Sequence, residues 1–113
     1  MSTFNLEIVA TDKIFYKGPC EFLVFPGIDG EHGILANHEP MVAAMQAGEL
    51  RYTTDGTVHE AAVGDGIVEV SSEKVVVISD FAEKPEEIDV KRAERAKERA
   101  EERIRLKKSE KEY

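Results

Sequence analysis

Apolar residues recur at every second position at the start of the chain. Phe4, Leu6, Ile8 and Ala10 follow this period. Successive side chains of a β-strand point to opposite faces, so a period of two is typical of a strand with one buried face. The pattern therefore predicts a strand over residues 4–10, with one side turned towards a core.

Two further segments are continuously apolar and rich in strand-forming residues. Residues 22–25 form one such run, and Pro26 and Gly27 are expected to end it. Because the run does not alternate, it predicts a strand covered on both faces. Residues 75–78 form a β-branched run, which predicts a central strand.

Asp55 and Gly56 lie between two strand-like runs, at residues 50–53 and 58–63. An Asp-Gly pair favours a tight hairpin turn, because both residues tolerate the positive φ angles that such turns need. We expect a β-hairpin at this position.

Asp65 and Gly66 repeat the same signal before a further apolar segment at residues 67–70. This repeat predicts a second turn of the same kind. Several short strands with regularly spaced turn signals are typical of a small antiparallel β-sandwich or barrel.

The last part of the chain has a different pattern. Residues 86–108 contain no Gly or Pro and are nearly all good helix formers. Pro85 marks the junction, and the Asp89 carboxylate is suited to cap the first turn of a helix. One narrow stripe of mostly small apolar residues follows the helical repeat: Ala93, Ala96, Ala100 and Ile104. We therefore expect a β-sandwich over residues 1–84 and a helical segment over residues 85–113, weakly docked and in need of a neighbour.

The charge distribution changes at the same junction. The chain carries a net charge of −8, with five basic and fourteen acidic residues up to Lys84 and ten basic and nine acidic residues from Pro85 onward. An acidic body argues against nucleic acid as a partner, because phosphate binding needs clustered cations. Neither a membrane span nor a signal peptide is expected, because the apolar runs are short. The single Cys20 suits a reducing compartment and is expected to pack in the core.

Three glycines, Gly27, Gly30 and Gly33, resemble a phosphate-binding loop in their spacing. A strand-like Ile34 follows them instead of a helix, and acidic residues between them would repel an anion. We therefore expect no phosphate site. The acidic residues and His32 match no strong metal-binding template, so no metal site is expected either.

Candidate catalytic residues are sparse. His32, His38 and His59 are separated along the chain, and Cys20 has no evident base. We expect no catalytic site. One function without catalysis is that of a free-standing β-sandwich adaptor, which would bind a partner helix through its own helix. The short alanine stripe is weak for the adaptor role.

The same glycine segment also resembles the loop of the epsilon subunits of rotary ATP synthases. Residues 27–40 read GIDGEHGILANHEP, similar to that family's Gly-x-x-Gly-Glu-x-Gly-Ile-Leu run followed by His-x-Pro. Similar family segments occur in the same order at residues 4–11, 47–51, 63–70 and 87–102. The resemblance covers essentially the whole chain, and its specificity comes from the joint occurrence of these segments.

The resemblance implies a ten-stranded β-sandwich followed by a helical hairpin, in a non-catalytic rotor subunit that couples proton translocation to ATP synthesis and hydrolysis. It implies binding to the gamma subunit and to the polar loops of the membrane c-ring, and a peripheral position on the cytoplasmic face of an energy-coupling membrane, such as a bacterial plasma membrane. No cofactor is implied as required.

By position in the family motif, one turn would face the c-ring, and His38 would lie beside the rotor contact. The residues of that turn are Asp29, Glu31 and His32. An apolar contact patch is expected to include Met41, Val42 and Met45, because flexible Met side chains suit such a surface. The alternative is that both methionines belong to the core and that His38 caps a turn.

Two departures from the family pattern are visible. Ala36 and Asn37 replace a frequent Pro-Gly pair, and Asn37 is expected to preserve the turn because Asn tolerates positive φ. The chain also stops at Tyr113, so the second helix of the hairpin is expected to be absent.

The resemblance implies a helical hairpin that reaches the catalytic alpha and beta subunits in many bacterial relatives and binds ATP in some of them. The positions that match this regulatory ATP site are Glu83, Ile88, Asp89, Arg92, Ala93 and Arg99. Arginines can bind phosphate oxygens, but those of the second helix are missing. We therefore expect weak ATP binding or none, with Asp89 as a helix cap and both arginines on a solvated surface.

Overall fold

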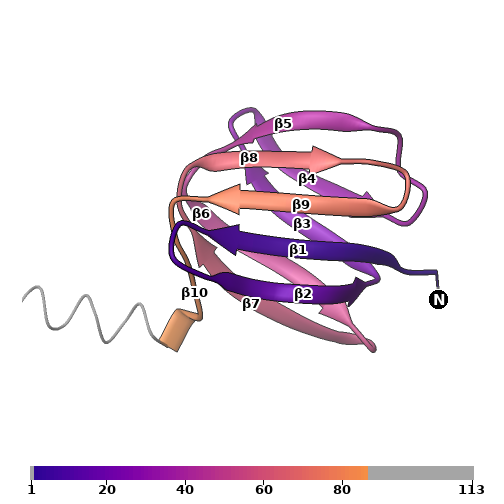
Figure 1. Cartoon of the computed structure of the whole chain (residues 1–113), viewed down its shortest axis with the longest axis horizontal. Coiled ribbons are helices and arrows are strands. Elements are labelled where there is room, and N and C mark those ends of the chain that lie inside the picture. The colour runs from indigo at the N-terminus through magenta and orange to yellow at the C-terminus, as the bar shows by residue number, and fades with distance from the viewer. Residues whose placement is uncertain (1, 87–113) are drawn as a thin grey trace, which may run out of the picture.

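A computed structural model describes residues 2–86 of the chain, and these residues form a β-sandwich (Figure 1). Its strands are β1 (Phe4–Ala10), β2 (Ile14–Cys20), β3 (Phe22–Gly27), β4 (Gly30–Leu35), β5 (Met41–Met45), β6 (Gly48–Thr54), β7 (Thr57–Val63), β8 (Gly66–Val70), β9 (Lys74–Ser79) and β10 (Ala82–Glu83). The mainly β fold expected from the sequence is confirmed.

The strands form two layers. The first layer has the strand order β5-β8-β9-β1-β2, and the second has the order β10-β7-β6-β3, with β4 paired to β3. A single pair, Gly27 opposite Met45, joins β3 to β5 and links the layers along one side. All neighbours are antiparallel except β1 and β9, which pair in parallel. That parallel pair was not predicted.

The core lies between the two layers and is built from the alternate residues of each strand. Leu6 and Ile8 of β1 are fully buried there, together with Leu23 and Phe25 of β3. Cys20 is buried as well and forms no disulfide, as expected for a packing residue. Burial raises the pKa of its thiol, which disfavours the reactive thiolate.

The prediction for residues 22–25 was right about the strand and wrong about its covering. Leu23 and Phe25 are buried, but the Phe22 side chain is 36% exposed and Val24 is half-buried. The outer face of β3 is therefore open. The strand also continues through Pro26 to Gly27, because these residues remain paired with β4.

The hairpin predicted at Asp55 and Gly56 is confirmed. Both residues have positive φ, and Thr54 pairs with Thr57 across the turn between β6 and β7. Asn37 also adopts a positive φ, of 65°, as expected from its place in the family loop.

The second Asp-Gly signal was misinterpreted. Asp65 and Gly66 do not join two paired strands: β7 lies in the second layer, and β8 pairs with β5 and β9 in the first. The segment is a crossover between layers. The Asp65 carboxylate accepts a hydrogen bond from the backbone N–H of Ala47 at 2.9 Å, which fixes the crossover to the start of β6.

The predicted helical segment lies almost entirely outside the described residues. Pro85 and Glu86 have helical backbone geometry. The predicted cap at Asp89 and the predicted apolar stripe lie in residues 87–113, outside the described part of the chain. The expectation about a second helix therefore stays a prediction. Within residues 2–86, no helix is long and apolar enough to cross a membrane.

Candidate functional site

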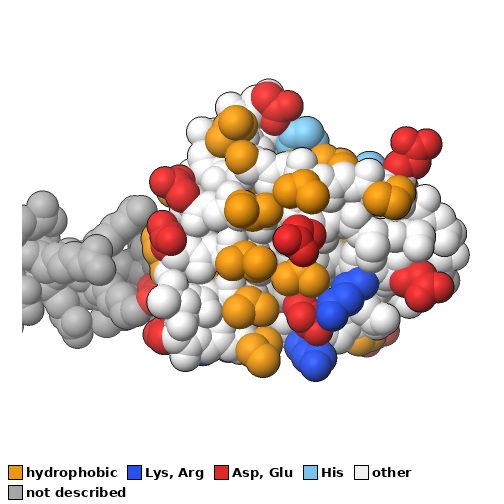
Figure 2. All heavy atoms as spheres, turned by 45° about the horizontal axis from the view of Figure 1, so that its top comes forward, with side chains coloured by type: hydrophobic (Ala, Val, Ile, Leu, Met, Phe, Trp, Pro, Cys, Tyr) orange, Lys and Arg blue, Asp and Glu red, His pale blue; other side chains and the backbone are white. Residues whose placement is uncertain are grey.

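A row of apolar side chains crosses the outer face of the first layer. Strand pairing places Ala44 of β5 opposite Ile67 of β8, and Ile67 opposite Ile78 of β9. Ile78 is in turn opposite Val9 of β1, and Val9 is opposite Ile14 of β2. The apolar row, as we call these five residues, spans every strand of the layer. Figure 2 shows hydrophobic side chains following one another in a line across this face.

A parallel row beside it alternates apolar and acidic side chains. Val42 is opposite Glu69, Glu69 is opposite Val76, and Val76 is opposite Glu7. Glu7 forms an ion pair with Lys74 at 3.1 Å and a longer one with Lys17 at 3.8 Å. An apolar centre flanked by charges is typical of a protein-binding surface.

Two local features bring the apolar row into line. A register shift between Ile8 and Val9 brings Val9 opposite Ile14. Gly66 allows β8 to approach β9, because a Cβ atom at this position would overlap the carbonyl oxygen of Ile78. The row therefore depends on close backbone packing between β8 and β9.

The β3–β4 hairpin carries the acidic turn predicted from the sequence. His32 Nε2 lies 2.7 Å from Asp29 Oδ1, and the His32 ring stacks on the buried Phe25. The hydrogen bond from His32 holds the pKa of the Asp29 carboxyl below its usual value. Glu31 accepts a hydrogen bond from Arg51 at 2.9 Å.

The predicted contact residues on β5 do not form one patch. Met45 is only 2% exposed and belongs to the core, so its predicted place in a contact surface was wrong. Met41 is half-buried against the core, whereas Val42 is 72% exposed on the outer face. The reason is the strand geometry, since Val42 and Met45 are three residues apart and point to opposite faces.

His38 lies just before β5 and is half-buried. Its Nδ1 is 2.9 Å from the carbonyl oxygen of Glu39, to which it can donate a hydrogen bond. This contact resembles the turn-capping alternative. None of the five residues of the apolar row was predicted as a contact residue, because the local sequence pattern does not reveal which strands lie side by side.

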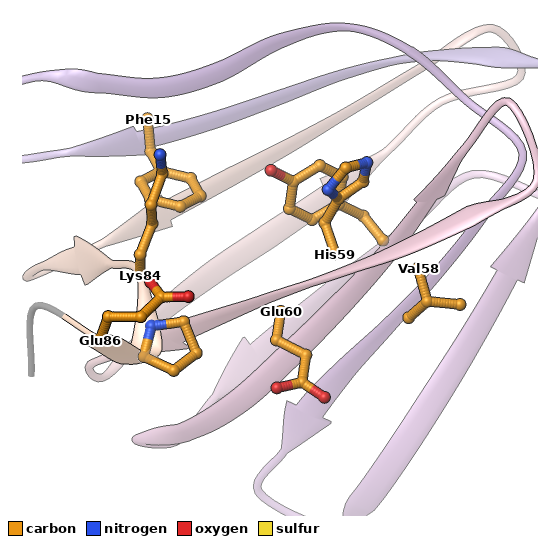
Figure 3. A pocket seen from close by; sticks show the side chains of 8 residues that line it. Phe15, Val58, His59, Glu60, Lys84 and Glu86 are labelled. Atoms are coloured by element: carbon orange, nitrogen blue, oxygen red, sulfur yellow. The ribbon is translucent and has the colours of Figure 1, made fainter. Parts of the chain in front are cut away.

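A hollow of about 430 Å³ opens near the end of the described chain (Figure 3). The His59 ring stacks on Tyr52 at 5.1 Å, and His59 Nε2 is 2.8 Å from Thr54 Oγ1. The other lining residues are Phe15, Val58, Glu60, Lys84, Pro85 and Glu86. Burial raises the pKa of the Tyr52 hydroxyl, so this group stays protonated at neutral pH.

Of the positions matched to a regulatory ATP site, only Glu83 is described. It lies in β10, half-buried, opposite Ala62 of β7. The remaining positions, Ile88, Asp89, Arg92, Ala93 and Arg99, lie outside the described residues. Within residues 2–86, no group of His, Cys, Asp and Glu side chains is arranged to hold a metal ion.

Two family models match the chain. Residues 3–85 match the β-sandwich domain of the ATP synthase delta/epsilon chain, and residues 86–113 match its long α-helix domain. Together the two matches cover nearly the whole sequence.

Similar proteins carry the corresponding name. An ATP synthase epsilon chain from Ruminiclostridium cellulolyticum is 46% identical over 113 residues, which cover 100% of this chain and 84% of the relative. An epsilon chain from Caldicellulosiruptor saccharolyticus is 48% identical over 107 residues, covering 95% and 78%.

Among solved structures, a chain of the Euglena gracilis mitochondrial ATP synthase has the same fold. Its TM-score is 0.75 at 24% identity, and the match covers 89% of this chain and 65% of that one. The fold likeness agrees with the sequence matches, which decide the family. The chain belongs to the ATP synthase delta/epsilon family and is a non-catalytic rotor subunit.

Proposed function

We propose that this chain transmits rotation by being held between the gamma subunit and the c-ring of its ATP synthase. In this role it couples proton translocation through the ring to ATP synthesis and hydrolysis. It makes and breaks no bonds of its own. The apolar row would bind gamma, and the tip of the β3–β4 hairpin would meet the polar loops of the ring.

The observation that carries the proposal is the apolar row. Ile67 and Ile78 stand at its centre, 47% and 46% exposed, and Ile14 at its end is 63% exposed. Burying such a side chain fully contributes about 1.5–3 kcal/mol. A line of apolar side chains over a stiff sheet offers a partner a surface that excludes water without needing to rearrange.

The hairpin tip suits a second and more polar contact. Asp29 and Glu31 lie at or beside the turn between β3 and β4, and both side chains are largely exposed. An acidic tip favours a basic loop as its partner, although each exposed ion pair contributes only about 0–1 kcal/mol. Most of the affinity would therefore come from the apolar row.

The c-ring lies in the membrane, so a subunit bound to it is held at the membrane surface without crossing it. We place this chain on the cytoplasmic face of an energy-coupling membrane, in a bacterium the plasma membrane. Relatives of bacterial origin at 46–48% identity support this assignment.

The helical segment would reach the alpha and beta subunits and influence ATP hydrolysis only weakly. No cofactor is required for the structural role. ATP would bind weakly or not at all. If calorimetry finds that ATP binds the chain with micromolar affinity, and that Arg92→Ala abolishes this binding, this part of the proposal is contradicted.

A pair of charge substitutions tests the binding face. Ile78→Glu places a charge in the centre of the apolar row, and Val58→Glu makes a similar change on an exposed β7 residue of the second layer. Substitutions at the centre of an interface commonly cost about 2 kcal/mol or more. We expect Ile78→Glu to weaken binding of the full chain to purified gamma by about 30-fold or more, with Val58→Glu close to wild type.

Circular dichroism and thermal unfolding of both variants control for loss of fold. If folded Ile78→Glu binds gamma as tightly as Val58→Glu does, the assignment of this face is wrong. If the wild-type chain forms no complex with gamma at all, the proposed coupling role fails, and the adaptor alternative replaces it.

A further inference from the structure

The β3–β4 hairpin is closed by a tight turn and is anchored on one side. Gly27 and Gly30 are the last paired residues, so Ile28 and Asp29 alone form the turn. The Ile28 backbone N–H donates to the carbonyl oxygen of Ala44 at 3.2 Å, and that of Gln46 donates to Pro26 at 2.9 Å. These bonds fix the base of the hairpin to the end of β5, but they leave the side chains of the turn unrestrained.

His32 supplies the missing restraint. Its Nε2 is 2.7 Å from Asp29 Oδ1, and its ring lies parallel to that of Phe25, with an interplanar angle of 7° and centroids 5.0 Å apart. Phe25 is fully buried, so the stack ties the imidazole to the core. Aromatic stacking of this kind stabilises the contact beyond simple burial.

The backbone leaves room for this ring at one place. A Cβ atom at Gly27 would lie 2.6 Å from His32 Cδ2, closer than real Cβ contacts allow. Glycine is therefore needed at position 27 for the imidazole to cover the end of the hairpin. The absence of a side chain at Gly27, the stack on Phe25 and the bond to Asp29 together hold His32 in one orientation.

The charged groups near the tip are each held within the chain. Asp29 is bonded to His32, and Glu31, on the opposite face of β4, is bonded to Arg51. Ile28, which precedes Asp29 in the turn, has 68% of its surface exposed. The tip thus presents two acidic groups in fixed positions beside an exposed apolar side chain, and a partner need not order the acidic groups on binding.

We propose that His32 is a positioning residue: by bonding Asp29 and stacking on Phe25, it fixes the hairpin tip in the geometry that meets the c-ring. This inference rests on the proposed function for the identity of the partner. The fixed tip itself is a property of this chain alone. His32 acts through Asp29 and does not touch the partner.

Two substitutions separate the hydrogen bond from the stack. His32→Phe keeps a flat ring against Phe25 but cannot bond Asp29. His32→Gln loses the ring but keeps an N–H donor close to the place of Nε2. In the full wild-type chain, nuclear magnetic resonance should find a proton on His32 Nε2 that is hydrogen-bonded to Asp29, and the Asp29 carboxyl titrating below its usual pKa.

We expect the pKa of Asp29 to rise towards its ordinary value in His32→Phe and to stay low in His32→Gln. The affinity of the full chain for the detergent-purified c-ring should fall about three- to tenfold in His32→Phe, as expected for one or two side chains that must be ordered on binding. His32→Gln should recover most of that loss. A role in folding alone would not produce this rescue.

Ile28→Ser distinguishes failure of the inference from failure of the proposed function. If Ile28→Ser weakens ring binding and His32→Phe does not, the tip contacts the ring but His32 does not position it. If neither variant changes ring binding, the proposed contact fails and the inference fails with it. An Asp29 carboxyl that titrates normally in the wild-type chain would also overturn the inference.

Discussion

The outer faces of the two layers differ, although their inner faces are alike. The first layer carries the apolar row, whose members are paired opposite one another across all its strands. The second layer carries Arg51 in the middle of β6, opposite Glu60, with ion pairs to Glu31 at 2.9 Å and Glu49 at 3.6 Å. One face offers an apolar line across all its strands, and the other carries paired charges beside the exposed side chains of Phe22, Leu35 and Val58.

The difference shows how a β-sandwich can acquire a binding face without a change in its core. Both layers bury their alternate residues, so the core constrains only half of each strand. The outward-facing residues of each strand are free to differ between the two layers. In the first layer, strand register aligns apolar residues that are far apart in the sequence, such as Val9 and Ile78. The face is thus made by register, and changes that disturb register should have the largest effect.

The largest effect is expected at Gly66. In Gly66→Ala, the added methyl group would overlap the carbonyl oxygen of Ile78, forcing β8 away from β9 and breaking the centre of the apolar row. We expect the free energy of unfolding to fall by about 3 kcal/mol or more, measured by urea unfolding.

Gly56→Ala is the matched control, because Gly56 has open space around it and only its positive φ opposes a side chain. Its cost should be about 1–2 kcal/mol. Equal costs at the two glycines would show that the close approach of β8 and β9 is unimportant.

A smaller effect is expected at Ser79, the buried hydroxyl at the end of β9. Its Oγ donates to the carbonyl oxygen of Phe81 at 2.7 Å and accepts from the backbone N–H of Gly64 at 2.9 Å, so it holds the crossover between the layers. Ser79→Ala removes this acceptor and leaves the Gly64 N–H only its longer bond to the carbonyl oxygen of Phe81, at 3.2 Å, so it should cost about 1–3 kcal/mol in thermal or urea unfolding.

The exposed Ser71, which bonds Lys74 in a surface turn, provides the comparison. Ser71→Ala should cost less than about 1 kcal/mol, since water can replace the lost bonds. A larger loss at Ser71 than at Ser79 would contradict the role given to the buried hydroxyl.

The smallest effect is expected on the charged face. Arg51→Ala removes the ion pairs with Glu31 and Glu49. The side chains of all three residues are at least partly exposed. The free energy of unfolding should change by only about 0–1 kcal/mol, and the change should shrink further in high salt. Binding to gamma should differ from wild type by less than about twofold.

Should Arg51→Ala weaken gamma binding as strongly as Ile78→Glu does, the two faces would not differ in the way proposed here. Measuring both variants against gamma at low and high salt separates the two explanations. An apolar contact persists when ions screen charges, whereas an ion-pair contact weakens.

The local pattern of the sequence was enough to predict several strands and one turn. Alternation in β1 gave the buried set of Leu6 and Ile8, because the side-chain period of a strand is fixed by its backbone. Asp55 and Gly56 gave a correct hairpin, and Asn37 a correct positive φ, because these conformations depend on the residues themselves. The family motif gave the acidic turn.

Other features could not be predicted, because they depend on partners distant in the sequence. Strand β2 contains Gly18 and Pro19, which are poor strand formers, and owes its pairing to β1. Asp65 and Gly66 have the same residue types as the hairpin pair Asp55 and Gly56. They nevertheless form a crossover between layers, because β8 pairs with β5 and β9 and not with β7.

The amino-acid sequence by itself determined that this chain is a β-sandwich of the ATP synthase delta/epsilon family, with strands and turns set by local preferences. Tertiary structure alone decided that the Met45 side chain is buried while the side chains of Val42 and Phe22 are exposed. It also decided that five apolar residues, distant in the sequence, form one row. The physical reason is that burial and register are set by which strands lie side by side, and short-range preferences carry no information about that choice.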